Sequence, residues 1–314
     1  MQYYFIINPA SGQGKAAGPL RMQIEEAFRE TGITPQIFET AGVRDAEVIA
    51  AQIARELDGE PARVWACGGD GTAGETVCGL TGHPNIAFGI IPIGTGNDSI
   101  RNFGLPKEAF LDVRAQLNGS VQQIDLMQYT GIVNGKNETR FCVNMFNNGF
   151  DSNVVAAAAQ LKTLPLISGS FAYYLGIIQM LIEKRGISLK IYADDEQVSA
   201  GNVLLCAIAN GSYCGGGVYS SPQAVMNDGL MDLSIIKDTT RRRFIKLFPS
   251  YAKGEHLNRD DIHDLISVYK CKTVRLLPDG TNDFLFCADG EINRTTGLTI
   301  TVVPGALPFI VPQP

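Results

Sequence analysis

Cys67-Gly68-Gly69-Asp70-Gly71-Thr72 lies between a β-type run at 62–66 and a helix-like run at 75–80. Its three glycines allow a sharp turn and let the backbone approach a bulky anion. An aspartate in such a turn would repel a bare phosphate, but it suits a divalent cation that lies between the carboxylate and the phosphates. The stretch therefore indicates a nucleotide–metal site and phosphoryl transfer.

The composition is that of a packed globular protein. The chain has 314 residues, of which 45% are hydrophobic and 18% charged, and this length favours two domains. The net charge of −6 gives no overall attraction to nucleic acid, so we expect no nucleic-acid partner. Seven cysteines without a CxxC pair are typical of reduced thiols, and the N-terminus shows no signal peptide, so we expect a cytoplasmic protein.

Residues 1–127 alternate strand and helix patterns. Strands are predicted at Tyr3–Ile7, Gln36–Phe38, 62–66 and Ile86–Pro92, and helices at Leu20–Glu30 and Asp45–Leu57. This alternation predicts an α/β fold with a doubly wound sheet, whose ligands lie beyond the carboxyl ends of the strands. Three polar turns follow apolar strands, and we expect them to converge on one crevice. They are Asn8–Gly14, Gly68–Thr72 and Gly94–Asp98.

From residue 128 to residue 303 the pattern changes to short β-like runs between turn residues, which predicts a β-rich, sandwich-like second domain. The runs are Arg140–Asn144, Ser188–Ala193, Val203–Ala209, Met231–Ile236, Thr273–Leu277, Phe284–Ala288 and Leu298–Val303. A helical insert is predicted at 154–184, and residues 304–314 are expected to return to the first domain as a strand. The uncharged stretch Thr163–Ile182 is long enough to span a bilayer, but Pro165 and its polar residues favour a helix of a soluble domain.

Residues 69–74 also match the G-x-G-x-x-G pattern of dinucleotide-binding folds, and residues 12–17 match its G-x-G-x-x-A variant. The Rossmann fingerprint belongs after the first strand, whereas the full match follows the third and contains Asp70. A dehydrogenase that binds NAD(H) without magnesium is therefore one alternative, and ordinary βα turns without a ligand are another.

The third turn adds side chains that suit phosphate or ribose. Thr95 and Asn97 can bond to their oxygens, and Asp98 supplies a second acid for a metal–phosphate site beside Asp70. The alternative is an N-cap, in which Asn97 or Asp98 caps a following helix.

Together the three turns resemble bacterial diacylglycerol kinase and related lipid kinases. The motifs that carry the resemblance are Asn8-Pro9-Ala10-Ser11-Gly12, Gly68-Gly69-Asp70-Gly71-Thr72 and Gly94-Thr95-Gly96-Asn97-Asp98. The wider superfamily includes sphingosine, ceramide and NAD kinases and phosphofructokinases. The resemblance covers nearly the whole chain and implies ATP and Mg²⁺ as cofactors. One departure is Ala73-Gly74, where the family usually has Leu-Asn, although Glu75 is kept.

The resemblance also implies roles for single residues. The nucleotide would contact Asn8, Pro9, Ser11, Gly12, Thr40, Gly68, Gly69, Gly71, Thr72, Glu75, Thr95, Asn97 and Asp98. A structural magnesium would be held by Asp228 and the carbonyls of Val225 and Leu230, and Asp125, an acid at the domain junction, is grouped with these metal residues. The catalytic residues would be Asp289 as general base, Glu291 holding a metal or a water, and Asp70 at the magnesium of ATP.

From the residues alone, two of these sites have another interpretation. Asp289-Gly290 follows a β-type run and could be a plain hairpin turn rather than a site for proton transfer. Asp228-Gly229 also fits a turn, and it fails the EF-hand pattern because Ala224 and Met226 occupy positions that need acids.

Arg241–Phe248 mixes basic and bulky apolar residues. Such a segment can rest on an anionic bilayer, and it can equally be a helix start on a soluble surface. We expect a protein that is peripheral to the inner face of the membrane rather than transmembrane, with a lipid substrate at that surface. The oligomeric state is left open, with a homodimer as one arrangement.

These features predict an ATP-dependent lipid kinase that transfers the γ-phosphate to a lipid hydroxyl, with diacylglycerol as the first candidate and phosphatidic acid as the product. ATP would lie in the interdomain crevice. An NAD kinase-like enzyme shares the Gly-Gly-Asp-Gly-Thr motif and is the second hypothesis. A nucleotide- or lipid-binding regulator that has lost catalysis is the third, because of Ala73-Gly74.

Overall fold

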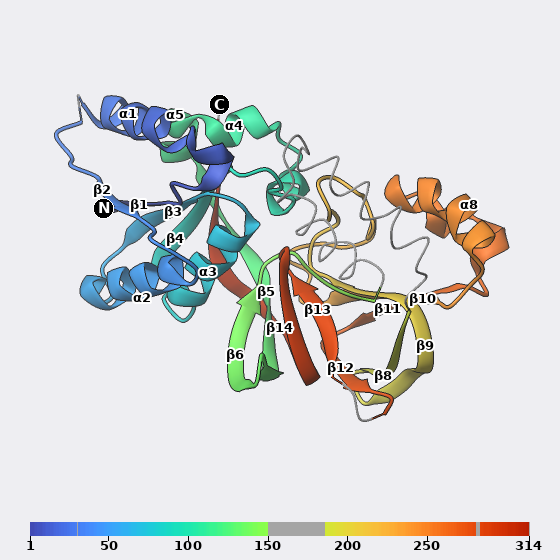
Figure 1. Cartoon of the computed structure of the whole chain (residues 1–314). Coiled ribbons are helices and arrows are strands. Elements are labelled where there is room, and N and C mark those ends of the chain that lie inside the picture. The colour runs from blue at the N-terminus through green and yellow to red at the C-terminus, as the bar shows by residue number, and fades with distance from the viewer. Residues whose placement is uncertain (30, 150–185, 281–282, 314) are drawn as a thin grey trace. The chain divides into compact units, whose positions relative to one another are not determined.

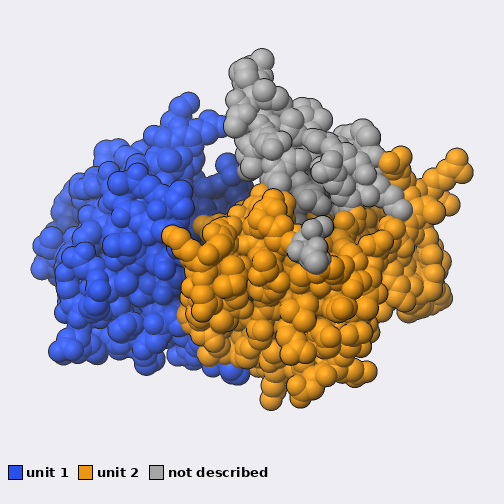
Figure 2. All heavy atoms as spheres, turned by 60° about the horizontal axis from the view of Figure 1, so that its bottom comes forward, with its two compact units in different colours: residues 1–126, 304–314 blue, residues 127–303 orange. Residues whose placement is uncertain are grey.

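The computed structural model describes residues 1–29, 31–149, 186–280 and 283–313. The chain divides into two compact units, residues 1–126 with 304–314, and residues 127–303 (Figure 2). The helical insert predicted at 154–184 and the stretch Thr163–Ile182 both lie outside the described residues. Among the residues that are described, no helix is both long and apolar enough to span a membrane.

The first unit is built on a parallel sheet in the order β2-β1-β3-β4. Its strands are β1 (Gln2–Ile7), β2 (Gln36–Glu39), β3 (Ala62–Cys67) and β4 (Ile86–Ile91). The end of β14 (Glu291–Val311) joins β4 in parallel, as the strand predicted for the C-terminus should. The strand order reverses between β1 and β3, which is the switch point where doubly wound sheets bind ligands.

Helices cover both faces of this sheet (Figure 1). On one side are α1 (Ala17–Phe28) and α5 (Val113–Leu117), and on the other are α2 (Asp45–Leu57) and α3 (Asp70–Leu80). Helix α1 buries Leu20, Ile24 and Phe28, which recur every four residues and so share one face. Short helices follow β4: η2 (Ser99–Phe103) and α4 (Lys107–Leu111), while η1 (Ser11–Gly14) follows β1. The predicted α/β class is confirmed.

The second unit is made of antiparallel strands. They are β6 (Lys136–Cys142), β7 (Met145–Gly149), β8 (Ile187–Ala193), β9 (Glu196–Ala209), β10 (Met231–Lys237), β11 (Ile266–Cys271), β12 (Thr273–Pro278) and β13 (Phe284–Ala288), with the second part of β5 (Ser120–Val133) and the first part of β14. Pairing runs from β7 through β9, β8, β12, β14 and β13 and back to β7. This closed ladder surrounds an apolar core that includes Phe146, Ile208, Leu233, Leu276 and Phe286. The β-rich, sandwich-like class is confirmed.

Helix α8 (Arg241–Ala252) packs on the outside of this unit, followed by η3 (His256–Asn258) and η4 (Asp260–Ile262). Its residues Phe244, Leu247 and Tyr251 meet Leu204 and Ile236 in a second apolar cluster. The basic segment predicted from the sequence is therefore an amphipathic helix whose apolar side is buried.

Candidate active site

The turns after β1 and β3 flank the switch point and are tied together by Asn8. Its Nδ2 donates to Thr72 Oγ1 at 3.1 Å, and its Oδ1 accepts from the backbone N–H of Ala10 at 3.0 Å. Gly12 in the same turn has φ +61°, a conformation that favours glycine. The first two predicted turns thus form one polar surface at the carboxyl edge of the sheet.

The second and third turns approach each other so closely that only glycine fits. The Gly94 N–H donates to the Gly68 carbonyl at 2.9 Å. A Cβ at Gly94 would lie 2.5 Å from Gly69 Cα, so any side chain there would push the two turns apart. The close approach thus fixes the second turn against the third.

Asp70 joins the same two turns through its carboxylate. It is the first residue of α3, and its Oδ2 and Oδ1 accept from the backbone N–H groups of Asn97 (2.6 Å) and Asp98 (3.1 Å). A carboxylate at a helix N-terminus is favoured by the helix dipole. The structure therefore brings Asp70, Asn97 and Asp98 together, as the sequence predicted.

Asn97 and Asp98 do not act as side-chain caps. No cap hydrogen bond is found from Asp98 at the start of η2, and Asn97 donates from Nδ2 to the Gly94 carbonyl at 2.9 Å. Asn97 adopts φ +62°, and its buried Oδ1 has no partner among the described residues. Asp98 Oδ1 lies 3.3 Å from Arg101 Nε. In the described part of the chain, the Oδ1 of Asn97 is therefore the polar atom of this turn that a ligand could use.

Lys107 is a residue of this site that sequence reasoning missed. It lies on α4, and its Nζ donates to the Gly94 carbonyl at 3.1 Å. Burial, with the charge of Arg101 second, lowers the pKa of Lys107, and Asp70 and Glu108 oppose that shift. No motif marks Lys107, because its position depends on how α4 folds back over the third turn.

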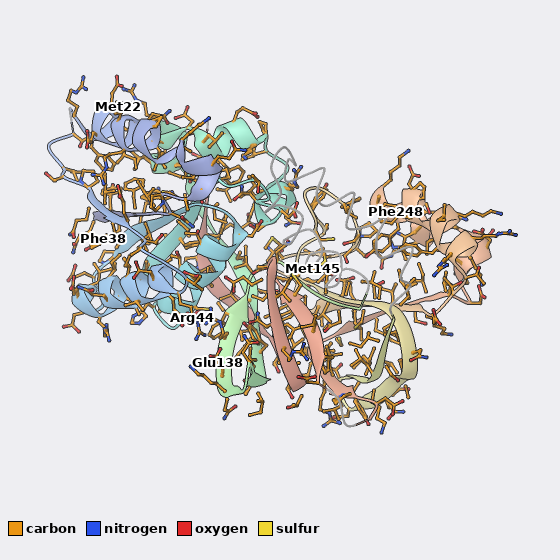
Figure 3. All side chains as sticks on the ribbon, in the orientation of Figure 1. Met22, Phe38, Arg44, Glu138, Met145 and Phe248 are labelled. Atoms are coloured by element: carbon orange, nitrogen blue, oxygen red, sulfur yellow. The ribbon has the colours of Figure 1, made fainter. Side chains whose placement is uncertain are left out.

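Thr40 lies beside the turn after β1, and Glu75 is bound to the backbone at the start of α2. Thr40 follows β2, and its N–H donates to the Ile7 carbonyl at the end of β1 at 2.9 Å. Glu75 Oε1 accepts from the Arg44 N–H at 2.8 Å, and Oε2 accepts from the Ala46 N–H at 3.3 Å. Glu75 is 8% exposed, and its carboxylate caps α2 at the segment that includes Arg44 (Figure 3); its contact with a nucleotide stays a prediction.

The remaining predicted residues of the first unit lie in these turns. Pro9, Ser11 and Gly71 are partly buried and Thr95 is exposed. Asp125 is 2% exposed, and its Oδ1 accepts from the Gly305 N–H at 2.7 Å, so it fastens β5 to the returning strand.

In the second unit, Asp289 accepts hydrogen bonds from the backbone of a distant segment, as Asp70 does in the first unit. It occupies the two-residue turn between β13 and β14, so the predicted hairpin is real. Its Oδ2 accepts from the Val143 N–H at 2.6 Å, and its Oδ1 accepts from the N–H groups of Asn144 (3.0 Å) and Met145 (3.1 Å; Figure 3). Burial raises the pKa of Asp289, and these three donors oppose the shift.

The thiol of Cys142 is a fourth donor to Asp289. Burial, with the charge of Asp289 second, raises the pKa of Cys142 well above its usual range, so the thiol keeps its proton. A carboxylate has about four acceptor positions, and Asp289 has a donor for each. Glu291, the first residue of β14, is partly exposed.

The predicted ligands of a structural magnesium lie next to a lysine. Asp228 Oδ1 accepts from the Leu230 N–H at 3.0 Å, and Oδ2 accepts from Lys270 Nζ at 2.9 Å. Burial favours the neutral amine, but the bonds to Asp228 and Asp232 outweigh it and raise the pKa of Lys270. Burial raises the pKa of Asp232, and Lys270 opposes that shift. Within the described residues, no group of three or more His, Cys, Asp or Glu side chains could hold a metal ion.

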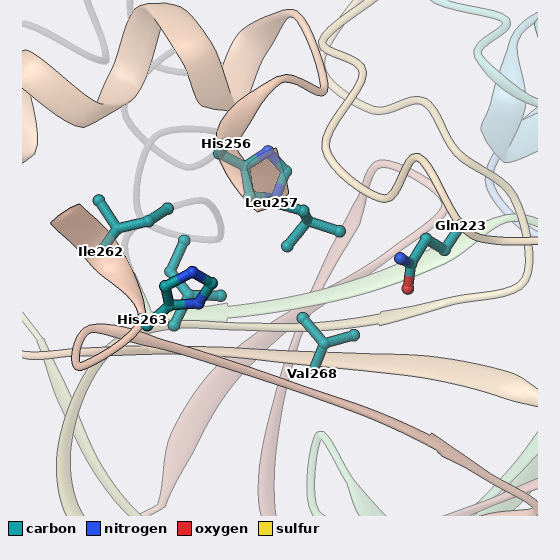
Figure 4. A pocket seen from close by; sticks show the side chains of 7 residues that line it. Gln223, His256, Leu257, Ile262, His263 and Val268 are labelled. Atoms are coloured by element: carbon teal, nitrogen blue, oxygen red, sulfur yellow. The ribbon is translucent and has the colours of Figure 1, made fainter. Parts of the chain in front are cut away.

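A pocket of about 250 Å³ lies elsewhere in the second unit, beside β11 and η3 (Figure 4). It is lined by Gln223, His256, Leu257, Ile262, His263, Ile266 and Val268. Burial lowers the pKa of His256 to about 4, so this imidazole is neutral at physiological pH. None of the predicted site residues lines this pocket.

Comparison with known proteins identifies the class. The profile of the diacylglycerol kinase catalytic domain matches residues 2–129, and that of the YegS C-terminal NAD kinase beta sandwich-like domain matches residues 144–311. A diacylglycerol kinase of Bacillus subtilis (strain 168) is 31% identical over 261 residues, which are 82% of this chain and 80% of that protein. Fold, site and matches define a lipid kinase.

Two further similarities cover almost the whole chain. A diacylglycerol kinase of Mycobacterium tuberculosis (strain ATCC 25618 / H37Rv) is 28% identical over 312 residues, 98% of this chain and 94% of that protein. A crystal structure of a diacylglycerol kinase from Bacillus anthracis str. Sterne shares the fold, with a TM-score of 0.68 at 22% identity over 100% of this chain and 97% of that one. The chain belongs to the diacylglycerol kinase family, and such a kinase implies ATP as the phosphate donor.

Proposed function

We propose that this lipid kinase transfers the γ-phosphate of ATP to diacylglycerol and forms phosphatidic acid. The observation that carries the proposal is the Asp70 carboxylate, which holds the second and third turns together at the switch point of a parallel sheet. The relatives named diacylglycerol kinase support the choice of acceptor.

The first unit would bind the nucleotide at its glycine-rich turns. A Cβ would not fit at Gly68 or Gly94, so the main chain of these turns carries no side chain there, and Lys107 adds a positive charge beside Gly94. Phosphoryl transfer depends mostly on positioning and on neutralising phosphate charge, which these groups supply. Thr40 would contact the nucleotide next to the turn after β1.

Mg²⁺ fits the donor set of this site. The carboxylates of Asp70 and Asp98 and the buried Oδ1 of Asn97 are oxygen ligands, the type that Mg²⁺ prefers together with phosphate and water. When bound, the ion would neutralise charge on the phosphates of ATP. Asp70 would orient it, because its own position is fixed by the N–H groups of Asn97 and Asp98.

In the second unit we propose that Glu291 accepts the proton of the lipid hydroxyl and that Asp289 holds the turn in place. Asp289 would have to give up a backbone or thiol donor before it could accept another hydrogen bond. The sequence assigns the base to Asp289, and that assignment stays a prediction that variants of the two residues can decide.

A transfer assay with γ-labelled ATP tests the proposed substrate. Purified enzyme is offered diacylglycerol, a sphingoid base, a polyprenol and phosphatidylglycerol in mixed micelles, and NAD in solution. We expect phosphatidic acid as the main product. Labelled NADP would favour the NAD kinase hypothesis, and a different labelled lipid would replace diacylglycerol while leaving the lipid kinase in place.

We propose further that α8 contacts an anionic membrane surface. Two of its cations, Arg242 and Lys246, are exposed without a side-chain partner among the described residues, and Ile245 between them is 55% exposed. A neighbouring basic side chain, Arg243, is bound instead to Asp264. Exposed cations around an apolar side chain suit a surface of anionic lipid.

A further inference from the structure

Lys270 lies in the second unit at the centre of a group of oxygen atoms. Its Nζ donates to Asp228 Oδ2 at 2.9 Å, to Asp232 Oδ2 at 2.9 Å and to the Gln223 carbonyl at 3.3 Å. Two of these oxygens belong to the segment 223–228, and the third belongs to β10. The ammonium therefore fastens that segment to the sheet.

Strand pairing fixes the position of this ammonium. Lys270 on β11 stands directly opposite Asp232 on β10 in the antiparallel register. The side chain of Asp232 is 4% exposed, that of Asp228 27% and that of Lys270 38%. A buried carboxylate needs a partner of opposite charge, and Lys270 supplies it.

The oxygens that surround Lys270 are of the kind that bind a hard divalent cation, yet the ammonium already contacts three of them. The Asp228 carboxylate, on which a metal at this turn would depend, has Lys270 at Oδ2 and the Leu230 N–H at Oδ1. A divalent ion beside an ammonium would meet strong repulsion at such distances. The residues present do not fit a structural Mg²⁺ at Asp228, Val225 and Leu230.

We infer that the Lys270 ammonium takes the place of a divalent cation at the Asp228 turn, so that this turn closes without a metal. The ammonium of Lys270 on β11 joins the oxygens of Asp228, Asp232 and Gln223 and balances the charge of the two carboxylates. With an apolar residue at position 270, a metal ion would be needed for the same purpose. Removal of that charge leaves Asp228, Asp232 and the Gln223 carbonyl around a vacated position, which is a ligand set for Mg²⁺ or Ca²⁺.

The test uses nucleotide-free, full-length protein and measures its melting temperature with EDTA, with excess MgCl₂ and with excess CaCl₂. For the wild type we expect the three values to agree within about 1 °C, and we expect metal analysis after gel filtration to find no bound ion. Lys270→Met keeps the aliphatic stem and removes the charge, so in EDTA it should melt roughly 3–6 °C lower, and Mg²⁺ or Ca²⁺ should restore much of that loss.

Lys272→Met is the matched control, because Lys272 is exposed and no side-chain partner is found for it in the described part of the chain. Its melting temperature should equal that of the wild type and should not change with Mg²⁺ or Ca²⁺. If Lys270→Met fails to fold, Lys270→Arg provides the test, since it keeps a cation and should stay indifferent to EDTA.

Three results would overturn the inference: stoichiometric metal in the wild type, a wild-type melting temperature that falls in EDTA, or a Lys270→Met protein whose stability no divalent ion changes. A Lys270→Arg protein that EDTA destabilises would count against it in the same way. None of these measurements involves lipid or ATP, the nucleotide with which the ion proposed at Asp70 would bind, so a failure of this inference is distinguishable from a failure of the proposed kinase reaction.

Discussion

Asp70 and Asp289 both follow a strand and both hold backbone N–H groups of a distant loop, yet they occupy opposite kinds of site. Asp70 begins a helix in a parallel α/β sheet and accepts from two consecutive N–H groups beside glycine-rich turns and Lys107. Asp289 lies in a hairpin of an antiparallel unit and accepts from three consecutive N–H groups and a thiol.

The difference shows that the role of an acid that follows a strand depends on the groups around its carboxylate and not on its position in the sequence alone. Among the groups around Asp70 are two that an anion could use, namely glycine backbone without side chains and the ammonium of Lys107. The donors around Asp289 come from one short segment, 142–145, and they match the number of acceptor positions of a carboxylate. We therefore expect Asp70 to act on the phosphates and Asp289 to act on the position of its neighbours.

The largest effect is expected from Asp70→Asn. It should lower kcat/KM by about 10³-fold or more, because a carboxylate that positions a cation against phosphate is lost. The circular dichroism spectrum should stay native, since the amide keeps the shape of the side chain. Asp58→Asn, in an exposed left-handed turn where Asn is favoured, is the control and should keep full activity. A folded Asp70→Asn protein with near wild-type rates would contradict the role of Asp70.

Glu291→Gln and Asp289→Asn test the other side of the comparison. Glu291→Gln should lower kcat by about 10²–10⁴-fold with an unchanged melting temperature, as expected for a lost proton acceptor.

Asp289→Asn should act mainly on stability. One acceptor oxygen becomes an amide NH₂ that faces a backbone N–H, which costs about 1–3 kcal/mol and lowers the melting temperature by roughly 3–9 °C. The opposite result would be an Asp289→Asn protein that is stable but inactive, together with a Glu291→Gln protein that is fully active. That result would identify Asp289 as the base.

Much of this architecture could be predicted from the sequence, and the failures have a physical cause. Helix α2 was predicted with its observed bounds, because its apolar residues recur at helical spacing. Strand β7 was missed, since its five residues are all buried although Asn147 and Asn148 are polar. A pattern of alternating polarity cannot mark a strand whose polar side chains are buried.

The same limit applies to the site. The three turns were located by motif, because glycine and acids at strand ends are local signals. The partners of Glu75 and Asp289 lie 29–31 and 144–146 residues away, so no local pattern could distinguish a cap or a clamp from a ligand contact. Lys107 and Lys270 were missed for the same reason.

Gly94→Ala tests whether the close approach of the turns beside Asp70 matters. A Cβ at 2.5 Å from Gly69 Cα forces the turns apart, and a displacement of about 1 Å can cost up to 10²-fold, so we expect KM for ATP to rise roughly 10–100-fold. Gly18→Ala is the matched control, because nothing lies within 4 Å of a Cβ there, and alanine should leave activity unchanged and α1 equally or more stable. An unchanged KM in Gly94→Ala would show that the turns are free to separate.

Lys107→Met tests the difference between the surroundings of the two carboxylates. The ammonium of Lys107 lies near Asp70, whereas the group near Asp289 is the uncharged thiol of Cys142. We expect KM for ATP to rise about 10-fold with a smaller change in kcat, because the charge contributes to binding of phosphate in both ground and transition states. The KM of the wild type should also rise more steeply with KCl than that of the variant. Equal salt dependence in the two proteins would remove Lys107 from the nucleotide site.

The last prediction concerns binding to a membrane rather than catalysis, and it compares a cation of α8 that is paired with cations of α8 that face solvent. Arg242→Glu with Lys246→Glu should weaken binding to phosphatidylglycerol vesicles roughly 5-fold per lost cation, because each cation near an anionic surface contributes about 1 kcal/mol. Arg243→Gln is the matched comparison: its guanidinium is bound to Asp264, so it should lower stability more than vesicle binding. Activity on short-chain diacylglycerol in detergent should be unchanged in the Glu variant, since that assay needs no bilayer. If vesicle binding is also unchanged, the membrane surface lies elsewhere on the enzyme, and α8 serves only to cover the apolar cluster of Leu204 and Ile236.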